Sequence, residues 1–116
     1  MEKRPDFKFR HVGINAKDNA EAEATTMTLS NIFGIEYSKL PGSYLVGDHI
    51  EVMNHDNYGK FGHIAFTVAS IADAVGYLNE HGWEADMSTA VYKDDRIKIL
   101  YLSQEVAGFA IHLFEE

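Results

Sequence analysis

The stretch Phe61-Gly62-His63-Ile64-Ala65-Phe66-Thr67-Val68 lies near the middle of the chain and alternates between two kinds of side chain. Successive side chains of a β-strand point to opposite faces, so the stretch predicts a strand whose apolar face is formed by Ile64, Phe66 and Val68. His63 lies on the other face among small side chains. A histidine with small neighbours points into open space, where a ligand or a metal ion could bind.

The composition excludes several classes of protein. The chain has 116 residues, enough for one domain with a substantial core. Its 18 acidic and 10 basic residues give a net charge of −8, which argues against a nucleic-acid partner because such binding relies on clustered lysine and arginine. The lack of cysteine excludes disulfides and thiolate-bound zinc. No segment approaches the ~20 apolar residues of a membrane span, and residues 1–6 do not open a signal peptide, so we expect a cytoplasmic protein with no membrane partner.

The first half of the chain begins with a predicted strand over residues 7–16 that presents His11. Strict alternation puts Phe9, Gly13 and Asn15 on the face of His11, and Arg10, Val12 and Ile14 on the other face.

A helix is predicted next, from residue 18 or 19 to residue 31 or 33. Asp18 and Glu21 have the spacing of a capping box, and Gly34 is a typical helix stop. We expect four residues to face inward: Ala22, Met27, Leu29 and Ile32. Three short strands fit the residues that follow, at 35–39, 43–46 and 49–54.

The second half repeats this order after a polar connection over residues 55–61. The strand at 62–68 precedes a helix whose residues Ile71, Ala74, Val75 and Leu78 recur at the spacing of one helical face. Gly82 ends that helix, and strands are predicted at 83–87, 97–103 and 109–114, with Asp94 and Asp95 in a long turn. A repeated unit of this kind indicates two copies of one supersecondary structure that pair to close a core.

The expected fold is therefore α+β, with two βαβββ modules forming a curved mixed sheet around a cavity. We expect a single domain over residues 1–116, with module 1 at about 7–54 and module 2 at about 62–116. A homodimer is expected, because two such sheets could close around a site between them.

Four polar side chains occupy corresponding strand positions of the two halves: His11, Glu51, His63 and His112. Imidazole nitrogen and carboxylate oxygen are the usual thiol-free ligands of divalent zinc, nickel, cobalt, manganese and ferrous iron. Four ligands on rigid strands would make an open metal site suited to Lewis-acid chemistry. Each residue also has a plainer interpretation: the histidines as hydrogen-bonded structural residues, and Glu51 as a solvated carboxylate paired with a lysine such as Lys60.

The repeat resembles the vicinal oxygen chelate superfamily, which includes glyoxalase I, bleomycin- and fosfomycin-resistance proteins and extradiol dioxygenases. His11-Val12-Gly13-Ile14 and Gly62-His63-Ile64-Ala65-Phe66 resemble the openings of that family's two halves, and Gly108-Phe109-Ala110-Ile111-His112-Leu113 resembles its terminal strand. The resemblance implies a glyoxalase-like fold and a divalent metal held by His11, Glu51, His63 and His112. A narrower similarity, over residues 11–15, 47–53 and 108–113, is to a glyoxalase-like module fused to bacterial 2-keto-3-deoxy-6-phosphogluconate aldolases.

One departure from the family concerns the terminal strand, where glyoxalase I has a glutamate that binds the metal and moves a proton. Here His112 stands at that position, so the base would be Glu51, our first choice, or His112 itself. The leading hypothesis is a metal-dependent lyase or isomerase that acts on a small substrate with two adjacent oxygens through an enediolate. The alternatives are a non-catalytic small-molecule binding protein, as in the bleomycin-resistance branch, and an accessory module of sugar-acid aldolase metabolism.

Overall fold

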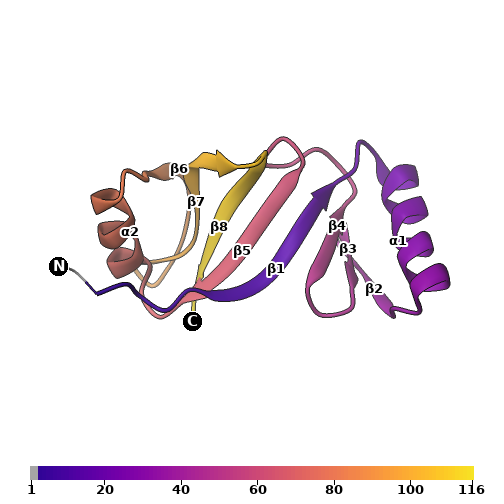
Figure 1. The fold of residues 1–116 in the computed structure, drawn as a ribbon, viewed down its shortest axis with the longest axis horizontal. Helices are drawn as coiled ribbons and strands as arrows, with labels where there is room; N and C mark the ends of the chain where they lie inside the picture. The colour runs from indigo at the N-terminus through magenta and orange to yellow at the C-terminus, as the bar shows by residue number, and fades with distance from the viewer. Residues whose placement is uncertain (1–2) are drawn as a thin grey trace.

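The chain folds into one mixed sheet of eight strands with two helices, as the computed structural model describes it for residues 3–116 (Figure 1). Module 1 holds five elements: β1 (Lys8–Asn15), α1 (Asn19–Phe33), β2 (Tyr37–Leu40), β3 (Ser43–Val46) and β4 (Ile50–Met53). Module 2 repeats their order: β5 (Gly62–Val68), α2 (Ile71–Glu80), β6 (Ala85–Lys93), β7 (Arg96–Val106) and β8 (Phe109–Glu115). The expected α+β fold with two βαβββ modules and a curved mixed sheet is confirmed.

The two modules join edge to edge through their first strands. The strand order is β2-β3-β4-β1-β5-β8-β7-β6, with β1 antiparallel to β5. Within each module the first strand pairs in parallel with the last, β1 with β4 and β5 with β8. Because of this order, the four strands expected to carry metal ligands, β4, β1, β5 and β8, are neighbours at the centre of the sheet.

Each helix has its own apolar core at one end of the sheet (Figure 1). The side chain of Asp18 accepts a hydrogen bond from the backbone N–H of Glu21 and so caps α1, and Ser70 caps α2 in the same way. The apolar stripe of α2 packs as predicted on the cluster that contains Leu100 and Leu113. In α1 the fully buried residues are Ala22 and Thr26.

The prediction that Ile32 faces inward is wrong, since its side chain is 72% exposed. The cause is a mismatch of lengths. A 15-residue helix is roughly 22 Å long, whereas the four-residue strands β3 and β4 beneath it span roughly 13 Å. The last turn of α1 therefore has no strand beneath it.

The turn at Asp94 and Asp95 is short, not long. Both residues have positive φ, 52° and 67°, which is the conformation of a two-residue hairpin turn that matches the twist of the strands. The flanking strands β6 and β7 consequently extend well beyond the predicted 83–87 and 97–103. Neither helix of the described residues is long and apolar enough to cross a membrane.

Candidate metal centre

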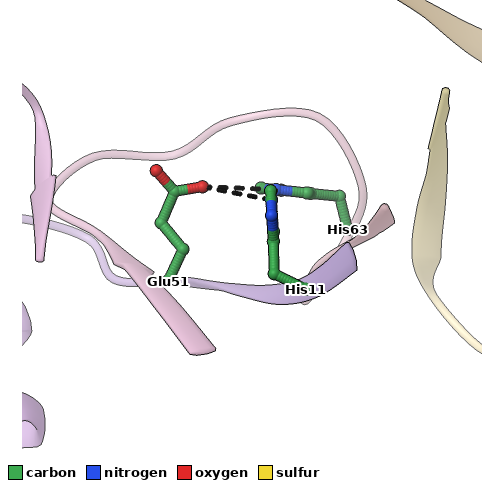
Figure 2. A group of neighbouring side chains, drawn as sticks. All are labelled: His11, Glu51 and His63. Atoms are coloured by element: carbon green, nitrogen blue, oxygen red, sulfur yellow. Dashed lines mark hydrogen bonds and ion pairs between the residues drawn. The ribbon is translucent and has the colours of Figure 1, made fainter. Parts of the chain in front are cut away.

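Three of the four expected ligands meet on one face of the sheet (Figure 2). Ile64 and Phe66 of β5 alternate with His63 and pack on the core of α2, so the ligands lie on the face opposite that helix. His11 lies on β1, Glu51 on β4 and His63 on β5, and their side chains point toward one another. The two imidazole Nε2 atoms are 3.1 Å apart. Oε1 of Glu51 lies 3.4 Å from Nε2 of His11 and 3.5 Å from Nε2 of His63.

The register of the strands explains this convergence. Gly13 on β1 lies directly opposite Glu51 on β4 and His63 on β5. Residues opposite one another point to the same face, so Glu51 and His63 flank Gly13, and His11 projects from the same face two residues earlier. A Cβ atom on Gly13 would lie only 2.6 Å from Nε2 of His63 and closer still to Nδ1 and Cε1. Glycine is therefore required here to leave room for the His63 ring.

The surroundings of Glu51 keep it ionised. The contact with the His63 ring lowers the pKa of this carboxyl, and the hydroxyl of Ser43, which donates to Oε2 at 2.9 Å, lowers it further, against the opposing effect of burial. The pKa of His11 is also lowered, chiefly by burial. The carboxylate of Glu51 and the imidazole of His11, which both resist protonation, are in the protonation states that metal binding requires.

The distances fit a bound divalent ion. Ligands at about 2.0–2.1 Å from zinc are about 3.3 Å from one another in tetrahedral geometry and about 3.0 Å apart in octahedral geometry. The three separations, 3.1, 3.4 and 3.5 Å, are close to these values. Within residues 3–116, one group of histidine and acidic side chains has all its potential ligand atoms within 4.8 Å of one another, and it consists of His11, Glu51 and His63. The residues present therefore fit a metal ion.

His112 shares this face but is not part of the close group. Its ring centroid is 5.5 Å from that of His63, and its plane is stacked on Tyr101 with centroids 3.9 Å apart. Neither of its ring nitrogens has a hydrogen-bond partner. The pKa of His112 is lowered to about 3, mainly by burial, so its ring is neutral at pH 7.

Sequence reasoning did not assign three neighbours of the site their observed contacts. Ser43 orients Glu51, whereas Lys60, the partner considered from the sequence, lies over the ring of Phe61. Tyr101 supplies the stacking surface for His112 from β7. Arg10, predicted on the opposite face, lies on the site face because the register between β1 and β5 shifts between Phe9 and His11. A one-residue bulge leaves no signal in the alternation of side chains.

Comparison with solved structures identifies the architecture. A methylmalonyl-CoA epimerase from Mycobacterium tuberculosis superposes with a TM-score of 0.67 at 17% identity, over 99% of this chain and 92% of that one. The chain has the vicinal oxygen chelate fold. A methylmalonyl-CoA epimerase from Streptomyces coelicolor, in complex with 2-nitronate-propionyl-CoA, matches with a TM-score of 0.63 at 15% identity, over 96% of this chain and 99% of that one.

The same fold recurs within a larger enzyme. Homoprotocatechuate 2,3-dioxygenase from Brevibacterium fuscum matches with a TM-score of 0.60 at 15% identity, over 97% of this chain and 33% of the dioxygenase chain. No protein-family model and no curated protein matches the sequence. The resemblance to the vicinal oxygen chelate superfamily is thus confirmed for the fold, and the narrower similarity to the aldolase-fused module stays a prediction.

Proposed function

We propose that this protein is a metal-dependent enzyme, of lyase or isomerase type, that acts on a small substrate carrying two adjacent oxygens. The observation that carries the proposal is the convergence of His11, Glu51 and His63 at the mutual distances of metal ligands. The two epimerases and the dioxygenase with similar structures are enzymes that act on small molecules and share this fold, which supports this class of function.

In this proposal His11 and His63 would hold a divalent ion through Nε2, and Glu51 would hold it through Oε1. The hydroxyl of Ser43 holds the other carboxylate oxygen and fixes the direction of Oε1. His112 is the fourth ligand only if its ring turns away from Tyr101. When bound, the ion would supply Lewis-acid polarisation of the two adjacent substrate oxygens. Its identity, among zinc, nickel, cobalt, manganese and ferrous iron, is left open by this donor set.

We propose Glu51 as the residue that moves the substrate proton, because it is the carboxylate of the group and has a second oxygen, Oε2, within reach of the same site. Oε2 accepts one hydrogen bond, from Ser43, and its second lone pair would take the proton. His112 is the alternative, since both its ring nitrogens lack a partner. Burial lowers its pKa to about 3, so it would be a weak base.

Hydrogen exchange tests the proposal. Protein loaded with each candidate metal is incubated in D2O with 2-oxoaldehyde–thiol adducts and 2-hydroxy ketones, and deuterium incorporation at the carbon beside the carbonyl is followed by NMR. We expect deuterium incorporation with the wild type and its loss in Glu51→Gln. The control Glu36→Gln, which removes an exposed carboxylate outside the site, should incorporate deuterium like the wild type. Equal incorporation in Glu51→Gln would contradict the assigned role of Glu51.

A second candidate is a non-catalytic binding protein, and the aromatic surface beside the site favours it. Tyr58 lies on Tyr101, Tyr101 stacks on His112, and His112 contacts Phe114, which makes a continuous row of rings. Such a row can bind a flat ligand without any metal. Ligand binding that persists in chelator-treated protein, without hydrogen exchange, would favour this candidate.

We also propose a homodimer and a cytoplasmic location. Strands β2 and β6 form the edges of an open sheet, so a second chain would be needed to close a cavity over the site. The mass in solution, measured by light scattering, tests the dimer. A cysteine-free composition is compatible with a reducing compartment, and the position of a fluorescent fusion in the cell tests the location.

A further inference from the structure

Arg10 is the cation that the bulge in β1 brings to the face of the candidate metal centre. Its guanidinium carbon lies 4.1 Å from the centroid of the Phe114 ring, and its Nη1 donates to Oγ1 of Thr67 at 3.4 Å. Thr67 and His63 are on the same strand with an even spacing and therefore share a face. Both contacts thus place the positive charge on the site face.

The ring of Phe114 lies beside Arg10 and also beside two of the site histidines. Its centroid is 5.9 Å from that of His11 and 4.4 Å from that of His112. The positive charge of Arg10 contributes to lowering the pKa of both histidines, in agreement with this proximity. A molecule bound both at the metal centre and at Arg10 would therefore contact the apolar ring of Phe114.

Arg10 also keeps most of its binding capacity free. A guanidinium has five N–H donors in a planar fork that suits carboxylate and phosphate. Within residues 3–116 its side chain makes one hydrogen bond, the long one to Thr67, and no ion pair. Two other surface cations are held in ion pairs, Lys8 with Glu116 and Arg96 with Glu115. Arg10 is exposed, so an anion from solvent can reach its free donors.

We propose that Arg10 binds an anionic group, a carboxylate or a phosphate monoester, of the substrate. This inference rests on the proposed function, because it assigns the other end of the substrate, with its two adjacent oxygens, to His11, Glu51 and His63. The substrate class is then a short-chain anion whose carbon atoms lie over Phe114. Arg10 is a specificity-determining residue and takes no part in the metal site.

Pairs of probes that differ by one remote anionic group test the inference. Zinc-loaded protein is titrated calorimetrically with 2-oxoglutarate and its 5-methyl ester, and with dihydroxyacetone phosphate and dihydroxyacetone. We expect the wild type to bind the charged member of at least one pair about tenfold more tightly, as a charge-assisted hydrogen bond would give. The pair that shows the preference distinguishes carboxylate from phosphate.

The variants assign that preference to Arg10. Arg10→Met is expected to bring the affinity ratio close to one, and Arg10→Lys to keep part of it, because lysine retains the charge without the planar fork. Lys39→Met is the matched control: Lys39 lies over the ring of Tyr44, and its removal changes the net charge by the same amount. The ratio should be unchanged in this control, and circular dichroism confirms that each variant is folded.

The outcomes separate this inference from the metal proposal. A ratio of one in the wild type, no binding of any charged probe, or an unchanged ratio in Arg10→Met would overturn the role of Arg10. If His63→Ala and chelator-treated protein keep a preference that Arg10→Met abolishes, the anion site stands and the metal proposal fails.

Discussion

The substitution Gly13→Ala tests whether the packing of His63 across β1 is what forms the candidate metal centre. The added Cβ would lie 2.6 Å from Nε2 of His63 and closer to two other ring atoms. Non-bonded heavy atoms prefer separations of about 3.5–4.0 Å, so the ring must move by about 1 Å or more. Metal sites tolerate displacements of about 0.2 Å, and we therefore expect His63 to be lost as a ligand.

The expected loss of metal affinity is more than about 100-fold, since changes to residues that merely support a ligand already cost about 10–100-fold. His63 is 2% exposed, so overpacking should also lower the free energy of unfolding of the metal-free protein by about 1–3 kcal/mol. Zinc affinity is measured by competition with a coloured chelator, and stability by urea unfolding.

Gly76 provides the matched control, because a Cβ added at this position in α2 meets nothing within 4 Å. Gly76→Ala should leave zinc affinity unchanged and raise stability by about 0.5–1 kcal/mol, as expected for alanine in place of glycine inside a helix. Adding His63→Ala to Gly13→Ala should restore stability without restoring zinc binding. A Gly13→Ala protein that binds zinc as tightly as the wild type would refute the reasoning.

Three further predictions concern the hydrogen bond to Glu51, the burial of His112 and the core on the opposite face of the sheet. Ser43→Ala removes the hydrogen bond to Oε2 of Glu51 and should weaken zinc binding by about 10–100-fold in the same competition assay; an unchanged affinity would show that Glu51 needs no support. Burial lowers the pKa of His112 from 6.5 to about 3, so the unfolded chain binds more protons between these values and stability falls as the pH drops through them. Between pH 7.5 and 4.5, the metal-free protein should lose on the order of 2–3 kcal/mol of its free energy of unfolding, measured with urea in the presence of a chelator. If His112→Gln loses stability with the same dependence on pH, the effect does not come from His112. Leu113→Ala creates a cavity on the helix face and should cost about 2–5 kcal/mol of stability while leaving metal stoichiometry intact; metal loss in the folded variant would show that the two faces are coupled.

The fold could be predicted from the sequence because both modules repeat one pattern of local signals. The stripe of Ile71, Ala74 and Leu78 in α2 and the alternation around His63 each determine a face without reference to the other module. In α1 the pattern is weaker, and whether Ile32 is covered depends on the length of strands elsewhere in the chain.

The site could be predicted only as far as strand faces. Alternation brings His11, Glu51 and His63 to one face, but the space for the His63 ring depends on Gly13, which lies on a different strand fifty positions earlier. Arg10 was misplaced because a bulge reverses the faces on one side of it. The position of the His112 ring relative to the other three side chains depends on its stacking on Tyr101 of β7. No local sequence pattern encodes that contact.

Metal content tests the central claim most directly. The protein is purified without chelator and without a metal-binding tag, and its zinc, nickel, cobalt, manganese and iron are measured beside those of His63→Ala and Glu36→Gln. We predict close to one divalent ion per chain in the wild type and in Glu36→Gln, and none in His63→Ala. A wild-type protein that takes up no ion, even after soaking with each of the five metals, would contradict the account.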